Sequence, residues 1–225
     1  MSTMNLAVLL INDDAFELAT LAEAMRLRGI NVDGKSSNIS TAENLFNTLK
    51  PDVVVIDVLF NSRTGVELAN QMRKKNKNLG VVHTASCPDL RLIGIHEKDI
   101  ARSARVVMKK AMADLDILCD AVPDSIRALE ANEGTLWVNR FPSTTGNSVY
   151  ATVNAITDIQ IETLRLVAAG MSNGEIAKLR FVSEKSVEQI VARLAQHLHI
   201  ESDRKRNLRV LLTNQYHKWV GAGAT

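Results

Sequence analysis

The chain has 225 residues, which suits two modest domains, because a typical domain has about 100–150 residues. Hydrophobic residues make up 46% of the chain and charged residues 23%, which excludes a disordered or fibrous protein. The formal net charge is only +2, but it is uneven: residues 1–150 carry 17 Lys or Arg against 18 Asp or Glu, and residues 151–225 carry 10 against 7. This excess of positive charge in the second part is compatible with contact to phosphates.

Neither export nor membrane insertion is expected. The longest early apolar run, Leu6–Ile11, lacks a basic flank and is far shorter than the roughly 18–20 residues that span a bilayer. Cys87 and Cys119 are far apart and fit neither a disulfide framework nor a paired metal-ligand spacing. We therefore expect a cytoplasmic protein with reduced thiols and no membrane partner.

The first half alternates short β-branched runs with amphipathic stretches. Val8–Ile11, Val53–Ile56 and Val81-Val82 are apolar at consecutive positions, which is typical of buried parallel strands. Apolar residues recur at helical spacing in stretches that end near Gly29 and before Pro51, and another helix is expected to begin at Gly65. Right-handed crossovers place such helices on both faces of the sheet. The pattern predicts a doubly wound α/β domain with a parallel five-stranded, flavodoxin-like sheet.

A linker and an all-α domain are expected next. Glycine, proline and small polar residues gather in residues 134–152, so we place a first domain at 1–133, a linker at 134–152 and a second domain at 153–225. Four helices are predicted, at about residues 158–169, 173–180, 184–198 and 203–219, with capping boxes at Thr157 and Ser172 and further N-caps at Ser183 and Ser202. The second and third are so close that they must form a helix-turn-helix.

Three carboxylates are expected at one edge of the sheet. Asp13 and Asp14 end the first strand and Asp57 ends the third, and the carboxyl ends of parallel strands meet at one edge. Acids crowded in this way repel one another unless a cation compensates. Oxygen ligands of this kind suit Mg²⁺, which is the cofactor we predict.

A hydroxyl and an ammonium complete this predicted site. Thr84 ends the fourth strand, and Lys109 follows the apolar run Val106–Met108, a candidate fifth strand. Both could hold the oxygens of a phosphoryl group carried by Asp57. Asp57 would attack phosphorus, Mg²⁺ would screen the charge, and Lys109 and Thr84 would hold the product.

This set of residues resembles the receiver domain of two-component response regulators, over residues 5–130. The match rests on Asp13-Asp14, Asp57 followed eight residues later by Gly65, Thr84-Ala85 and Lys109. The resemblance implies that Asp57 accepts a phosphoryl group from a sensor histidine kinase. It also implies that Asp14, Asp57 and the backbone carbonyl of Leu59 ligate Mg²⁺ directly, and that Asp13 acts through water. Such a phospho-acceptor is not an enzyme, beyond a slow self-dephosphorylation.

Several positions depart from that family. Phe60-Asn61 stands where most receivers have Met-Pro, the stretch from Thr84 to Lys109 is longer than usual, and Val106 replaces the aromatic switch residue. Pro123 falls inside the last predicted receiver helix, which should be kinked or restarted there. Lys110 is a second candidate for the conserved lysine.

Residues 156–177 and 182–187 resemble the DNA-binding domain of LuxR/NarL-type regulators. The resemblance implies that the helix after Ser183 enters the major groove of double-stranded DNA. Helical spacing gives this helix a core face, and the opposite face is left to contact DNA. The core face comprises Val187, Ile190, Val191, Leu194 and Leu198, and the DNA face comprises Lys185, Ser186, Gln189 and Arg193.

Glu188 and Ala192 stand on that helix where many relatives have basic residues, which would lower the intrinsic affinity for DNA. Other basic residues could contact the DNA backbone instead: Arg180, Arg204, Lys205, Arg206 and Arg209. Relatives use the final helix to form dimers, but here it could equally pack on its own domain. We interpret His197 and His199 as surface residues.

The sequence therefore predicts a transcription regulator in which phosphorylation of Asp57 favours a homodimer that reads paired half-sites on DNA. One alternative is an atypical receiver that is not controlled by phosphorylation and acts through protein-protein contacts. A second is a metal-dependent hydrolase with Asp57 as nucleophile, although no motif supplies a general acid.

Overall fold

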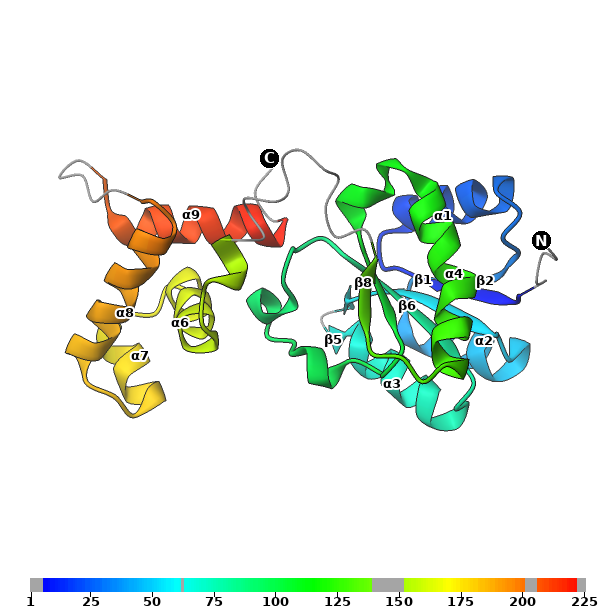
Figure 1. The fold of residues 1–225 in the computed structure, drawn as a ribbon, viewed down its shortest axis with the longest axis horizontal. Helices are drawn as coiled ribbons and strands as arrows, with labels where there is room; N and C mark the ends of the chain where they lie inside the picture. The colour runs from blue at the N-terminus through cyan, green and yellow to red at the C-terminus, as the bar shows by residue number, and fades with distance from the viewer. Residues whose placement is uncertain (1–5, 62, 139–151, 201–205, 222–225) are drawn as a thin grey trace. The chain divides into compact units, whose positions relative to one another are not determined.

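The computed structural model describes residues 6–61, 63–138, 152–200 and 206–221 (Figure 1). The chain divides into two compact units, residues 1–85 with 97–140 and residues 86–96 with 141–225. This division differs from the predicted domains chiefly in residues 86–96, which pack with the second unit.

The first unit is built on a parallel sheet with the order β2-β1-β3-β6-β7-β8. The strands are β1 (Val8–Ile11), β2 (Val32–Ser36), β3 (Val53–Asp57), β6 (Gly80–Ala85), β7 (Arg105–Met108) and β8 (Leu136–Val138). Every residue of β1, β3, β6 and β7 is buried, in keeping with their consecutive apolar residues. A small antiparallel hairpin, β4 (Leu59–Phe60) and β5 (Arg63–Thr64), follows β3.

The prediction of five strands is wrong, because Leu136–Val138 add a sixth. These residues fall in the predicted linker, yet they pair in parallel with β7, with Trp137 opposite Val106. A strand of three residues after Gly134 is too short to show a strand period, so its composition suggested a linker. Residues 139–151, the rest of the predicted linker, lie outside the described residues.

Helices cover both faces of this sheet, which confirms the doubly wound α/β fold. They are α1 (Ala15–Leu27), α2 (Ile39–Leu49), α3 (Gly65–Lys75) and α4 (Leu115–Glu130), with the short 3-10 helices η2 (Glu97–Asp99) and η3 (Lys109–Ala113). Figure 1 shows α1 and α4 on one face and α2 and α3 on the other. α4 continues through Pro123 as a single helix, so the predicted restart is wrong. Its apolar side buries residues before and after the proline, such as Val122 and Ala128, which stabilises the helix despite the missing backbone bond.

The second unit is helical where it is described, with α6 (Asp158–Ala168), α7 (Asn173–Arg180), α8 (Glu184–His197) and α9 (Leu208–Val220). The capping boxes at Thr157 and Ser172 are both formed, and Ser183 caps α8. α9 begins later than predicted, because Asn207 accepts a hydrogen bond from the N–H of Arg209 and acts as its N-cap. Residues 201–205, including the predicted cap Ser202, lie outside the described residues.

Candidate functional site

Asp57 lies at the carboxyl end of β3, with only 6% of the residue exposed. Its Oδ1 accepts a hydrogen bond of 2.8 Å from the backbone N–H of Leu59. Its Oδ2 lies 2.5 Å from Nζ of Lys109. A buried carboxylate is costly unless it is paired and hydrogen-bonded, and both oxygens meet this condition.

Lys109 follows β7 and carries the positive charge of this site. Its Nζ contacts Asp57 and also Oε2 of Glu17, at 2.7 Å. Burial by itself lowers the pKa of the ammonium, but the two carboxylates outweigh it, so the pKa lies above its usual value. Lys110, the second candidate, is exposed and belongs to no described ion pair. The structure thus brings Lys109 to Asp57.

Glu17 belongs to this site but was missed in the sequence. It lies in the first turn of α1, three residues after Asp14, and its side chain reaches Lys109. An acidic residue in the first turn of a helix is favourable in its own right, so its presence there does not indicate a more distant partner. Its partner is 92 residues away, and no local pattern indicates that distance.

Asp13 and Asp14 lie at the same edge, but both are exposed and engaged with the backbone. Oδ1 of Asp14 accepts from the N–H of Glu17 at 2.9 Å and caps α1, and Oδ2 of Asp13 accepts from the N–H of Asn61 at 3.2 Å. Among the described residues, no group of three His, Cys, Asp or Glu side chains converges as metal ligands. The oxygen donors nevertheless suit Mg²⁺, and its ligation by Asp13, Asp14, Asp57 and the Leu59 carbonyl stays a prediction.

The loop after Asp57 explains why Gly65 follows at this spacing. The N–H of Gly65 donates to the carbonyl of Val58 at 2.7 Å, and a Cβ at Gly65 would lie 1.9 Å from the carbonyl oxygen of Asp57. Phe60 and Asn61 stand in this loop where most receivers have Met-Pro. Phe60 is only 1% exposed, and Asn61 adopts a left-handed backbone with φ 50°. Asn61 also donates through Nδ2 to the carbonyl of Ser37. This loop is therefore fixed by an asparagine and a buried phenylalanine.

Thr84 and Val106 lie on the neighbouring strands. Thr84 is buried on β6, directly opposite Asp57 in the strand register, and its carbonyl accepts from the N–H of Val58 at 3.0 Å. Val106 is completely buried, opposite His83. A valine in this position fills the space beside β6 and has no ring to rotate between two environments.

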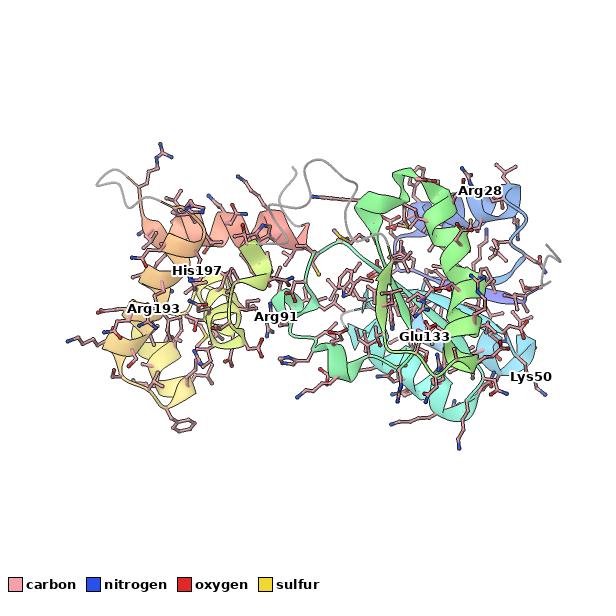
Figure 2. All side chains as sticks on the ribbon, in the orientation of Figure 1. Arg28, Lys50, Arg91, Glu133, Arg193 and His197 are labelled. Carbon is pink, nitrogen blue, oxygen red and sulfur yellow. The ribbon has the colours of Figure 1, made fainter. Side chains whose placement is uncertain are left out.

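The predicted DNA face of α8 is largely exposed. Lys185, Gln189 and Arg193 are exposed, and Arg193 is labelled in Figure 2. Ser186 is half-buried, with its hydroxyl 2.7 Å from that of Ser183. Glu188 is exposed on the same helix, so the charges of this surface partly cancel.

Two of the remaining basic residues are used inside the unit. Arg180 donates to Oγ1 of Thr163 at 2.7 Å and pairs with Glu162 at 3.3 Å. Arg209 donates to Oδ1 of Asn173 at 2.5 Å and also to the carbonyl of Met171. Arg204 and Lys205 lie outside the described residues, so their predicted DNA contact stays a prediction.

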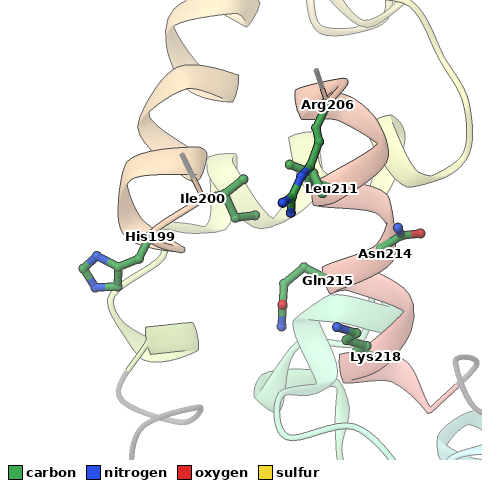
Figure 3. A pocket seen from close by; sticks show the side chains of 7 residues that line it. All are labelled: His199, Ile200, Arg206, Leu211, Asn214, Gln215 and Lys218. Carbon is green, nitrogen blue, oxygen red and sulfur yellow. The ribbon is translucent and has the colours of Figure 1, made fainter. Parts of the chain in front are cut away.

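A cavity of about 430 Å³ lies between the end of α8 and α9 (Figure 3). Basic and amide side chains dominate its lining, which consists of His199, Ile200, Arg206, Leu211, Asn214, Gln215 and Lys218. His199 and His197 are both exposed. Polar groups thus line one side of α9, and the opposite side packs in the core through Leu212 and Trp219.

Residues 8–91 match the model of the response regulator receiver domain, and residues 154–206 match that of the bacterial regulatory proteins of the luxR family. The chain is a response regulator of the LuxR family. The two resemblances drawn from the motifs are confirmed. In the described part of this response regulator, no helix is both long and apolar enough to cross a membrane.

Relatives match this response regulator over most of its length. The DNA-binding transcriptional activator EvgA of Escherichia coli is 23% identical over 194 residues, which cover 86% of this chain and 92% of EvgA. The response regulator protein VraR of Staphylococcus aureus is 25% identical over 206 residues, which cover 88% of this chain and 92% of VraR.

Solved structures share the fold. The RcsB–DNA complex matches with a TM-score of 0.55 and 20% identity, covering 96% of this chain and 100% of that one. A second match is RcsB from Salmonella enterica serovar Typhimurium, bound to promoter rprA in the presence of the phosphomimetic BeF3-. It gives a TM-score of 0.51 and 20% identity, and the match covers 95% of this chain and 98% of that one.

Proposed function

We propose that this response regulator is switched by phosphoryl transfer from a sensor histidine kinase to Asp57, and that the switch controls binding of DNA through α8. The pair of Asp57 and Lys109, at 2.5 Å, is the observation that carries the proposal. A cation beside an almost buried acceptor is what the anionic product of phosphoryl transfer needs. We place this activity in the cytoplasm, where the DNA is.

The chemistry uses groups of this chain at each step. A carboxylate oxygen of Asp57 forms a bond to phosphorus as the bond from phosphorus to the kinase histidine nitrogen breaks, and that nitrogen keeps the electron pair. Lys109 then turns from the carboxylate to a phosphoryl oxygen, and the Thr84 hydroxyl donates to another. Bound Mg²⁺ would supply further positive charge, held by Asp13, Asp14, Asp57 and the carbonyl of Leu59.

The Mg²⁺ requirement can be tested with a small-molecule phosphodonor. We expect intact-mass measurement to detect one added phosphoryl group with Mg²⁺ present and none after chelation with EDTA. Equal uptake in both samples would contradict the role of Mg²⁺. No uptake in either would favour the alternative of a receiver that acts through protein-protein contacts. Val106, which replaces the aromatic switch residue of the family, also favours that alternative.

The second half of the proposal is that α8 enters the major groove. Lys185, Gln189 and Arg193 offer exposed donors that suit base edges and phosphates, and Ser186 borders them. The RcsB complexes with DNA support this use of the fold. We propose that two copies bind as a homodimer, with the two α8 helices about one helical turn of DNA apart.

A salt titration of binding to duplex DNA tests this half. Arg193→Ala and Lys185→Ala should each weaken binding, and each should lower the slope of log affinity against log salt by about 1 if the side chain neutralises one phosphate. Arg127→Ala is the control, because Arg127 is an exposed arginine of the first unit. A control that weakens binding as much as Arg193→Ala would contradict the assignment of α8.

A further inference from the structure

Glu17 reaches the proposed phospho-acceptor site from the first turn of α1, although the receiver resemblance gives it no role. Its Oε2 lies 2.7 Å from Nζ of Lys109, and the same ammonium lies 2.5 Å from Oδ2 of Asp57. In the described part of the chain, no other Lys or Arg forms an ion pair with either carboxylate. One ammonium therefore serves two carboxylates.

The start of α1 holds Glu17 at this ammonium. The backbone N–H of Glu17 donates to Oδ1 of Asp14 at 2.9 Å, which is the N-cap bond of the helix. The Glu17 side chain is 26% exposed and that of Lys109 is 23% exposed, so water and salt screen their charges less than those of an exposed pair. The negative charge of Glu17 is therefore part of the environment that a phosphoryl group on Asp57 would meet.

This charge works against a phosphoryl group in two ways. A phosphoryl group brings further negative charge to Asp57, and the single positive charge of Lys109 is already balanced in part by Glu17. Glu17 also occupies one of the three N–H donors of the ammonium, which leaves fewer for phosphoryl oxygens. A carboxylate so close to the new anion repels it as well. Removing the charge of Glu17 should therefore favour the anion.

We propose that Glu17 is a positioning residue that holds Lys109 and opposes the phosphoryl group, so that it limits how far Asp57 becomes phosphorylated. This rests on the proposed phospho-switch. Asp57 and Lys109 supply the chemistry, and Glu17 sets the affinity of the site for the anionic group. The consequence is regulatory: a weak phosphodonor leaves most copies unphosphorylated, and a sustained supply from the kinase is needed to load the site.

The test measures the affinity of the full chain for the phosphomimetic BeF3- in the presence of Mg²⁺, with fluorine NMR to distinguish bound from free anion. Glu17→Gln keeps an oxygen that can accept from Lys109 and removes only the charge. It should bind BeF3- more tightly than the unmodified chain, by roughly three- to tenfold. Glu23→Gln removes a charge from the same helix, on a side chain that is 63% exposed, and should leave the affinity unchanged.

The sign of the change separates this role from a purely structural one, because a loss of structure cannot tighten the binding of BeF3-. Equal or weaker binding by Glu17→Gln would overturn the proposal although the phospho-switch stands. If the unmodified chain binds no BeF3-, the phospho-switch itself fails and takes this proposal with it. Glu17→Ala, which removes the charge together with the contact, replaces Glu17→Gln should that variant fail to fold, and the same tighter binding is expected of it.

Discussion

Lys109 is shared between two carboxylates, and this arrangement sets the charge around Asp57. Asp57 uses its other oxygen for the Leu59 N–H, so Glu17 is the group that competes for the ammonium. Side chains at this depth interact more strongly than exposed ion pairs, because less water screens them.

Glu17→Gln should lower the pKa of Lys109, because one of the two carboxylates that raise it loses its charge. An NMR titration of the Lys109 ammonium measures it. Glu23→Gln, in the same helix but with a side chain that is 63% exposed, should leave the pKa of Lys109 unchanged. Equal values for the two variants would contradict the role of Glu17.

His83 makes the first unit sensitive to acid. Its ring is fully buried on β6, and burial, with a smaller effect from the charge of Arg73, lowers its pKa to about 4. Its unfolded-state pKa is about 6.5, so between pH 6.5 and 4 the unfolded chain binds a proton that the folded chain does not. The free energy of unfolding should therefore fall as the pH falls through this window, by about 3 kcal/mol.

His83→Leu should remove this part of the acid sensitivity. Urea unfolding of the first unit can be followed by the fluorescence of Trp137 in a Trp219→Phe background, because the chain has 2 tryptophans. His197→Gln, which changes an exposed histidine of the second unit, is the control. A loss of stability between pH 6.5 and 4 that is the same with and without His83 would show that other groups cause it.

At the scale of elements, the segment 86–96 gives the most distinctive prediction. Leu92→Ala removes a fully buried side chain from the core of the second unit and should destabilise that unit by about 2–5 kcal/mol. Trp219 lies in this core and Trp137 lies on β8, so their fluorescence should report the two units separately. The unfolding transition that Trp219 reports should shift to a lower urea concentration, and the transition that Trp137 reports should be unchanged.

Leu27→Ala is the matched control, because Leu27 is 86% exposed and its truncation should move neither transition. If Leu92→Ala instead shifted the Trp137 transition alone, residues 86–96 would belong to the first unit. This measurement needs neither phosphorylation nor DNA.

The elements that sequence reasoning predicts well are those with strong local signals. The consecutive apolar residues of Val8–Ile11 and the capping boxes at Thr157 and Ser172 each act within a few residues, and the structure has them in place. The features that were missed depend on distant partners. β8 is a strand because it pairs with β7, and Glu17 belongs to the site because it contacts Lys109. Leu92 belongs to the second core because it packs against helices more than sixty residues further along the chain.

At the scale of the whole molecule, the proposed phospho-acceptor Asp57 belongs to the first unit and the helix-turn-helix belongs to the second. Asp57, Lys109 and Thr84 belong to one edge of the sheet, and residues 86–96 follow directly from that edge. The departures at Phe60-Asn61 and Val106 replace parts that other receivers use. The central claim is thus the phosphorylation of Asp57, on which the rest of the switch depends.

The most direct measurement is the intact mass of three proteins after treatment with a small-molecule phosphodonor and Mg²⁺. They are the unmodified chain, Asp57→Asn, and Asp52→Asn, which changes a carboxylate just before the opposite end of the same strand. We predict a gain of one phosphoryl group in the unmodified chain and in Asp52→Asn, and none in Asp57→Asn. No gain in the unmodified chain, or an undiminished gain in Asp57→Asn, would contradict phosphorylation of Asp57.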